Sequence, residues 1–184
     1  MTELDRTANV LGALAGTVTD QSAAAMLAAV DLPAKGSASG SSSALAALSS
    51  IAEFLGTPSV DQVRRVLGLT PSGAVRLIDR LEADGLVTRG PGANGRSRAI
   101  ALTDRGAAAA AALARARRDV LTTMLDGFTP EELVTFHGML GRVMRNAVHA
   151  KSGGAWICRM CDLTACRRAQ GHCPAATAAA AKYP

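Results

Sequence analysis

The sequence predicts a mainly α-helical protein that contains one small β-hairpin. Of the 184 residues, 48% are hydrophobic but only 3% are aromatic, and alanine supplies much of the apolar content. Alanine favours helices and fills little core volume, which is typical of long, thin helices. Apolar residues recur at helical spacing along most of the chain, while Asn94-Gly95 is a strong hairpin turn. Long helices with one apolar side also predict a partner chain that covers them.

Charge and hydropathy narrow the class of protein. The formal net charge is +5, and nearly all the basic residues are arginines, whose planar fork suits phosphate and guanine. No run of about 18 uncharged apolar residues indicates a transmembrane helix, and the acidic residues near the N-terminus do not fit a signal peptide. We therefore expect a cytoplasmic protein without membrane contact. In that reducing compartment, clustered cysteines favour metal or redox chemistry over structural disulfides.

The N-terminal third predicts two helices joined by a linker. Residues 5–32 carry an apolar stripe at helical spacing, formed by Leu4, Leu11, Leu14, Val18, Met26 and Val30. Residues 31–43, DLPAKGSASGSSS, have the composition of a linker or loop. A second helix is expected over 44–55, ending at Gly56, with one face made of Leu45, Leu48, Ala52 and Leu55.

The next stretch predicts a helix-turn-helix. Ser59 and Gln62 have capping-box spacing before a short helix that ends at Gly68. Thr70 takes the N-cap position and Pro71 the first position of a second helix. The second helix has an inward face of Ala74, Leu77, Ile78 and Leu81, and an outward face of Ser72, Arg76 and Asp79, flanked by Arg80. Two such helices around a tight turn, the second with a polar outer face, make a helix-turn-helix.

Two strand-like pieces follow. LVTR at 86–89 and RSRAIAL at 96–102 flank the Asn94-Gly95 turn and predict a hairpin. Arginines lie in or beside this hairpin, at Arg89, Arg96 and Arg98. A helix-turn-helix followed by a basic hairpin is the winged-helix pattern. The predicted fold class is therefore mainly α, with the α+β unit of a winged helix between long flanking helices.

Two long helices complete the predicted fold. Thr103 is expected to cap an alanine-rich helix that runs to about residue 126. The run 129–132, TPEE, has the capping-box pattern with proline at the first helical position, and opens a last helix to about 150. The apolar stripes consist of Leu113, Val120 and Met124 on the first helix, and Leu133, Phe136, Leu140, Val143, Met144 and Ala147 on the second. His137 lies on the second stripe and is expected to pack in the core.

The runs LGLTPSGAVRLIDRLEADGLVTR and NGRSRAIALTDRG resemble the multiple antibiotic resistance regulator (MarR) family of bacterial transcription factors. The likeness is close over about 43–106 and continues in the order and length of the helices to about 150. It implies a homodimer built from the N- and C-terminal helices, with one winged helix from each chain on a pseudo-palindromic DNA operator. It also implies repression that is relieved by a small ligand, a metal or an oxidant. The serine-rich linker and the segment after 150 depart from the family pattern.

The patterns and the resemblance together divide the chain into four parts. Residues 1–42 form the N-terminal dimerisation helix and linker, and 43–103 form the winged helix-turn-helix. Residues 104–150 form the long dimerisation helices. Residues 151–184 form a cysteine tail whose last ten residues have the composition of a frayed end.

The residues expected to contact DNA are Thr70, Ser72, Gly73, Arg76, Arg80, Arg96 and Arg98. A recognition helix meets base edges in the major groove with its N-terminal half, where Arg76 can pair bidentately with guanine and Gly73 permits close backbone approach. The free N–H groups of its first turn suit phosphate. Arg96 matches the wing-tip arginine that reaches the minor groove in the family. As the alternative, Arg76 and Arg80 face solvent or pair with Asp79.

All four cysteines lie within sixteen residues, in the pattern C-x2-C-x4-C-x6-C formed by Cys158, Cys161, Cys166 and Cys173. Zinc is the favoured ligand, because it takes four thiolate or imidazole ligands and the spacing resembles small zinc knuckles; His172 is an alternative fourth ligand. An iron–sulfur cluster is the main rival, since Cys173-Pro174 is typical of ferredoxin-type runs. A metal-free thiol switch, helped by nearby arginines, and inert thiols are the other two alternatives.

The leading function is thus a DNA-binding regulator, most simply a repressor, rather than an enzyme. In one alternative, the cysteines form a redox or iron–sulfur sensor that is itself the signal input. A dithiol oxidoreductase built on Cys158 and Cys161 lacks the βαβ context of thioredoxin. A winged helix that binds another protein instead of DNA is disfavoured by the arginines on the recognition helix and wing.

Overall fold

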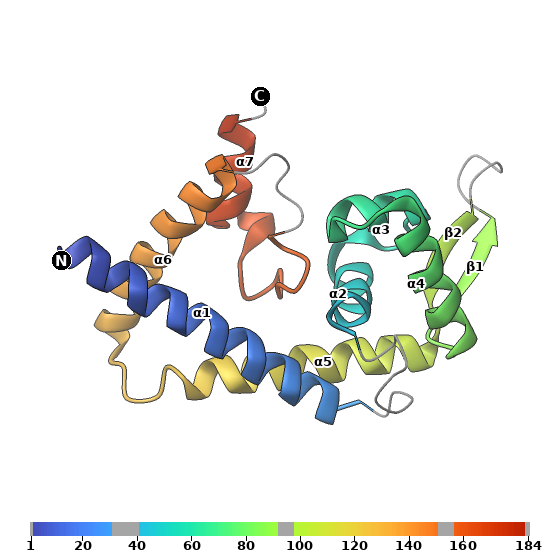
Figure 1. The fold of residues 1–184 in the computed structure, drawn as a ribbon, viewed down its shortest axis with the longest axis horizontal. Helices are drawn as coiled ribbons and strands as arrows, with labels where there is room; N and C mark the ends of the chain where they lie inside the picture. The colour runs from blue at the N-terminus through green and yellow to red at the C-terminus, as the bar shows by residue number, and fades with distance from the viewer. Residues whose placement is uncertain (1, 31–40, 92–97, 151–156, 183–184) are drawn as a thin grey trace.

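The computed structural model describes residues 2–30, 41–91, 98–150 and 157–182. Helix α5, Asp104–Thr123, forms the long axis of the molecule (Figure 1). A winged helix-turn-helix lies at one end of α5, and the C-terminal helices lie beyond its other end (Figure 1). The predicted class is confirmed, because the described chain is mainly helical with one two-stranded antiparallel sheet.

Helix α1, Glu3–Ala28, packs along α5. It begins two residues before the predicted start, because Thr2 and Asp5 form a capping box that the sequence analysis overlooked. Of the predicted apolar stripe, Met26 is buried in the core that α1 shares with the winged helix. The N-terminal half of the stripe is exposed in the single chain, with Leu11 43% and Leu14 42% exposed.

The second predicted helix is an α-helix that ends in a π-helical turn. Helix α2 spans Ser42–Ser50, and the π-helix η2 spans Ile51–Leu55. The turn closes with Gly56 N–H donating to the carbonyl of Ile51 over 3.1 Å. Because this wider turn shifts the helical register, Ile51 is buried and Ala52 is exposed. The prediction that Ala52 shares one face with Leu45 and Leu48 was therefore wrong, since those two leucines are buried.

The helix-turn-helix consists of α3, Val60–Leu67, and α4, Pro71–Ala83. Both predicted caps are confirmed: Ser59 and Gln62 form a capping box, and Thr70 accepts from Gly73 N–H. Gly68 ends α3 in the left-handed conformation, with φ 67°. The inward face of α4 is buried as predicted, through Ala74, Leu77, Ile78 and Leu81.

The wing consists of β1, Val87–Pro91, and β2, Arg98–Leu102, paired antiparallel from Val87 opposite Leu102 to Pro91 opposite Arg98. Ile100 is fully buried, and its N–H donates to the carbonyl of Pro58 over 2.8 Å, which ties the wing to the turn before α3. The predicted Asn94-Gly95 turn and Arg96 lie outside the described residues.

Helix α6, Pro130–Ala150, begins with the predicted capping box of Thr129 and Glu132. His137, which we expected in the core, is exposed in the single chain, on the side of α6 that faces the cysteine segment. None of the described helices has the length and apolar character needed to cross a membrane.

The last described residues form a helix rather than a frayed tail. Helix α7, Pro174–Lys182, packs against α6 with Ala175 and Ala178 buried. Its last turn is held by Lys182 Nζ, which donates to the carbonyls of Val148 at 3.2 Å and His149 at 2.8 Å. A cation at the carbonyl end of α6 is favourable, and alanine with proline at the first position suits a helix. The predicted frayed end was therefore wrong.

Gly106 generates a prediction about stability. A Cβ at this buried position would lie 1.9 Å from the carbonyl oxygen of Leu86, which belongs to the backbone and cannot turn aside. We expect Gly106→Ala to lower the free energy of unfolding by at least about 2 kcal/mol, as overpacking of a core does. Urea denaturation at a fixed protein concentration measures this.

The matched control is Gly12→Ala on α1, where a Cβ meets nothing within 4 Å. This substitution should stabilise the protein by about 0.5–1 kcal/mol, because alanine is the better helix former. Equal effects of the two substitutions would contradict the close approach of α5 to Leu86.

Candidate nucleic-acid interface and cysteine site

The outward face of α4 is open to solvent. Ser72, Arg76 and Arg80 are all exposed. Among the described residues, neither arginine has an ion-pair partner. Val75 lies on the same side and is 46% exposed. The sequence analysis missed Val75, although an apolar side chain on a recognition helix can contact a thymine methyl group.

Thr70 and Gly73 have a structural role at the start of α4. The Thr70 hydroxyl accepts from Gly73 N–H at 3.1 Å. A Cβ on residue 73 would lie 2.9 Å from that hydroxyl oxygen, so glycine keeps the cap undisturbed. The cap fixes where α4 begins, and therefore which residues occupy its N-terminal half.

An arginine from the wing neutralises the acidic residues of α4. Arg89 on β1 donates to Asp79 at 2.5 Å and also pairs with Glu82, and its side chain is only 16% exposed. Burial opposes its charge, but the hydrogen bond to Asp79 and the charge of Glu82 raise the pKa of Arg89 overall. Asp79 therefore pairs with Arg89 and not with Arg76 or Arg80, which was the alternative pairing. Spacing could not reveal this pair, because the hairpin folds back on the helix.

The other predicted or nearby arginines differ in their surroundings. Arg98 is exposed at the start of β2, beside the described end of the wing. Arg96 lies outside the described residues, so its place on the wing stays a prediction. Arg64 and Arg65 both pair with Asp61 at 2.7 Å, which holds them on the surface of α3. The cationic side chains left without a described partner at this end of the molecule thus lie on α4 and at the wing.

The four cysteines gather around one cavity. Its volume is about 200 Å³, and its other walls come from α6, including Leu140, Gly141 and Met144, and from the start of α7. Cys158 and Cys173 are buried, whereas Cys161 and Cys166 are partly exposed. His172 is exposed and does not line the cavity, so Cys173 is the better placed fourth ligand.

The thiols interact with one another and with nearby donors. The Cys161 thiol donates to the carbonyl of Ile157 at 3.9 Å. The neighbouring Cys161, together with Arg168, lowers the pKa of Cys158 to about 6. The neighbouring Cys158 and burial raise the pKa of Cys161, and burial raises the pKa of Cys166 to about 11. Cys158 is therefore more readily ionised than Cys161 or Cys166.

Two N–H groups point at the buried sulfurs. Arg168 Nη1 lies 3.4 Å from Cys158 Sγ, and Ala176 N lies 3.4 Å from Cys173 Sγ at the start of α7. Within the part of the chain that the structure describes, no three Cys, His, Asp or Glu side chains already have the geometry to hold a metal ion. The cysteines are therefore brought together, but their sulfurs do not yet surround one point.

The cysteine loop, residues 157–173, also contacts the winged helix. Leu163 N–H donates to Glu53 Oε2 of η2 at 3.1 Å. Met160 packs against the core of the winged helix, and Phe54 of η2 packs against the cysteine cluster. Sequence reasoning did not find this docking, because Glu53 and Leu163 are 110 positions apart.

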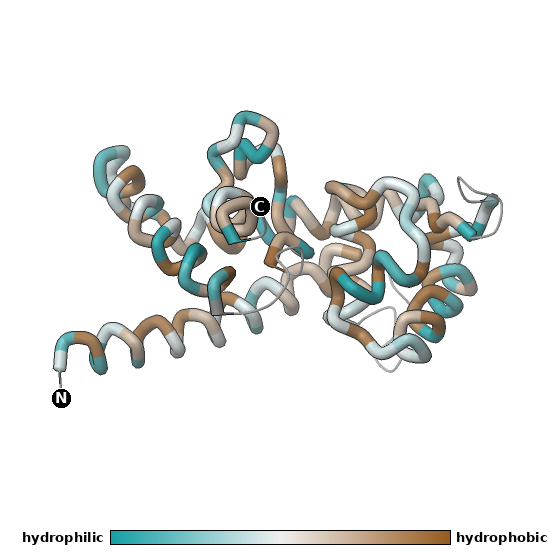
Figure 2. The backbone as a smooth tube through the Cα atoms, turned by 90° about the horizontal axis from the view of Figure 1, so that it is seen from above, coloured by the Kyte–Doolittle hydropathy of each residue, from teal (hydrophilic) through white to brown (hydrophobic). Residues whose placement is uncertain are grey.

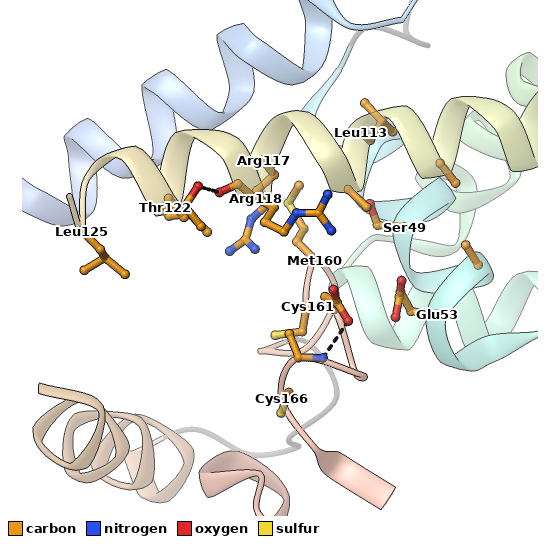
Figure 3. Close-up of a pocket in the computed structure, with 16 residues that line it drawn as sticks. Ser49, Glu53, Leu113, Arg117, Arg118, Thr122, Leu125, Met160, Cys161 and Cys166 are labelled. Atoms are coloured by element: carbon orange, nitrogen blue, oxygen red, sulfur yellow. Dashed lines mark hydrogen bonds between the residues drawn. The ribbon is translucent and has the colours of Figure 1, made fainter. Parts of the chain in front are cut away.

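An apolar pocket of about 280 Å³ lies between α5, η2 and the cysteine loop. Figure 3 shows Arg117 and Arg118 projecting from α5, and Cys161 and Cys166 on the facing loop. Both cysteines also line the cysteine cavity, so the loop is the wall between the two spaces.

The winged helix matches a known family in sequence. Residues 41–97, from α2 into the hairpin, match the MarR family. The winged helix-turn-helix of this chain is therefore similar to that of the MarR family. No curated protein matches the chain in sequence.

Solved structures extend the likeness to the long helices. A MarR family protein from Bacillus stearothermophilus is 22% identical with a TM-score of 0.67, and the match covers 80% of this chain and 98% of that one. A MarR family transcriptional regulator from Rhodococcus is 20% identical with a TM-score of 0.57, covering 78% and 95% of the two chains. MepR, a transcription regulator of the Staphylococcus aureus multidrug efflux pump MepA, is 18% identical with a TM-score of 0.51, covering 58% and 79%.

These matches show that the chain has the fold of these proteins. The match takes in nearly all of the Bacillus protein but leaves about a fifth of this chain outside it. The chain therefore contains residues beyond the shared MarR fold.

The Arg89 bridge generates a prediction. Arg89→Ala removes the contacts that hold β1 on α4, but Asp79 and Glu82 are 52% and 40% exposed and can be solvated. We therefore expect a loss of only about 1 kcal/mol in the free energy of unfolding. Urea denaturation beside Arg115→Ala, an exposed arginine of α5, tests this. Identical unfolding of the two variants would show that the bridge does not hold the wing.

Proposed function

We propose that this chain is a transcriptional regulator of the MarR type, acting in the cytoplasm as a repressor that binds a pseudo-palindromic operator as a homodimer. The observation that carries the proposal is the charge arrangement on α4. Arg89 neutralises Asp79 and Glu82, while Arg76 and Arg80 stay exposed on the same helix. A recognition helix whose carboxylates are paired and whose arginines are exposed without an ion-pair partner suits the phosphates and guanines of a major groove.

In this proposal each side chain has a separate role. Ser72 and Arg76 meet base edges from the first half of α4, and Arg80 meets phosphate further along the helix. The first-turn N–H groups near Thr70 and Gly73 also face phosphate. Arg96 enters the minor groove from the wing, and Arg98 contacts the backbone beside it.

The homodimer is supported by apolar side chains that the single chain leaves exposed. On α1 they are Leu4, Val10, Leu11, Leu14 and Leu27, and on α6 they are Leu133, Val134, Met139, Leu140 and Val143. Figure 2 shows apolar segments along both helices, which extend away from the winged helix. A second copy of the same two helices covers these faces, because like faces are self-complementary about a two-fold axis.

The signal in this proposal is a small molecule bound in the pocket between α5 and η2. Its walls are mostly apolar, and Arg117 and Arg118 add positive charge at one side. An effector of that chemistry is a small apolar anion. Its binding would shift the winged helix relative to α5, because the pocket lies between them.

The DNA contacts generate a paired prediction. We expect Arg76→Ala to weaken operator binding at least about fivefold and to relax the preference at one base pair. Arg96→Ala should weaken binding to all sequences and reduce the salt slope by about one. Fluorescence anisotropy across a salt series measures both, with Arg115→Ala as the control that leaves affinity and slope unchanged. Unaltered binding by both variants would rule out these contacts.

The dimer helices generate another prediction. We expect the double variant Leu11→Glu/Leu14→Glu to be monomeric in sedimentation velocity, because it places charge on an exposed apolar face without touching the core. The control is Asn9→Glu, an exposed polar position on the same helix, which should stay dimeric. A dimeric double variant would show that the face of α1 around Leu11 and Leu14 is not the interface.

A further inference from the structure

We propose that Cys158, Cys161, Cys166 and Cys173 bind one zinc ion, and that the loaded loop is a strut that holds the winged helix in place relative to α6. The first half of this proposal is independent of DNA. The second half rests on the proposed operator binding, so the two halves have separate tests.

The ligand set comes from the shared cavity. All four thiols line this cavity of about 200 Å³, together with side chains of α6. A tetrahedral zinc site with bonds of about 2.3 Å holds its sulfurs roughly 3.8 Å apart, which is close to thiol–thiol contact. A [4Fe–4S] cluster requires its cysteines to stand around a larger cube. Four thiols around one small cavity supply the complete ligand set of a single ion, and zinc would have to draw the sulfurs together to complete the site.

The surroundings also fit a tetrathiolate centre. When zinc binds, the thiols release their protons to solvent, and the completed site carries two negative charges. Arg168 and the Ala176 N–H, at the first turn of α7, lie beside two of the sulfurs. Donors of this kind orient thiolate ligands and offset their charge. Zinc also supplies the tail with the stability that its small alanine-rich core lacks.

The loop that carries the cysteines joins the two ends of the molecule. On one side it lies against α6 and α7 through the cysteine cavity. On the other side Leu163 is held by Glu53, and Met160 and Phe54 are packed across the contact. Figure 1 shows this segment between α6 and the winged helix, on the same side of α5 as α2.

A loaded loop therefore restrains η2, and with it the helix-turn-helix, from the side opposite to the wing. A winged helix that is already held in place loses less freedom when it binds DNA. Removing zinc should weaken operator binding by at least about fivefold, the lower end of typical coupling between two sites.

The first test is metal content. Untagged protein purified without oxygen should be colourless and contain about one zinc per chain by elemental analysis. Cobalt substituted for zinc should give visible bands of a tetrahedral site and an intense sulfur-to-cobalt charge-transfer band. The control His172→Ala should keep its metal, and Cys166→Ser should lose most of its affinity for it.

Three outcomes would overturn the metal site. One is iron with sulfide and a brown colour; the second is protein without metal whose thiols pair as disulfides; the third is full zinc in Cys166→Ser. Because a cysteine variant can also misfold, zinc is removed from the wild type with a chelator as a second measurement. Hydrogen exchange should then rise in residues 157–173 and fall again when zinc is restored, and unchanged exchange would count against the site.

The second test addresses the strut. Glu53→Ala removes the acceptor of the Leu163 N–H but no cysteine, so it should keep one zinc per chain. Its operator affinity should match that of zinc-free wild type and no longer respond to zinc removal. If the wild type binds zinc but its operator affinity is the same with and without the metal, the strut is wrong and the metal site stands. If neither form binds any operator, the proposed DNA function fails and with it the strut.

Discussion

The close packing between the first turn of α5 and the backbone just before β1 determines how the winged helix is attached to the long helix. Thr103 caps α5, its N–H donates to the carbonyl of Leu86 at 3.1 Å, and its hydroxyl donates to the carbonyl of Gly85 at 2.7 Å. Gly106 lets the helix approach that backbone without a side chain between them. The end of α4, the wing and the long helix therefore meet in one small region. The recognition helix is thus joined to α5 through the short stretch of backbone at Gly85 and Leu86.

Much of the winged helix could be predicted from the sequence because its signals are local. Capping pairs such as Ser59 and Gln62 lie within one turn, and the inward face of α4 repeats at helical spacing. The start of α7 also had a local signal, because Pro174 and the alanines after it favour a helix. The composition of the last ten residues had instead indicated a frayed end. Local chemistry was therefore sufficient for the elements of the winged helix, whereas the bounds of α1 and the existence of α7 were missed.

The features that escaped prediction depend on backbone geometry or on contacts between distant residues. The π-helical turn at Ile51 changes which side of the helix faces inward, and no rule of residue spacing predicts such a turn. The pairing of Arg89 with Asp79 depends on the hairpin folding over α4. The docking of Leu163 on Glu53 depends on the whole path of the chain from one end to the other. The positions of the candidate DNA contacts on α4 followed from its periodicity, whereas the charge balance around them did not.

The contact between Glu53 and Leu163 also bears on the order in which the protein forms during synthesis. It closes a loop of 110 positions, and the entropy of closing a long loop is lost before the contact rewards it. The winged helix shares its buried core with α1 and α5, which also precede the cysteine loop, so this part can fold while the loop is still being made. A newly made chain thus acquires its candidate DNA-binding surface first. The contact between Glu53 and the cysteine loop forms only after residues 157–173 have been made.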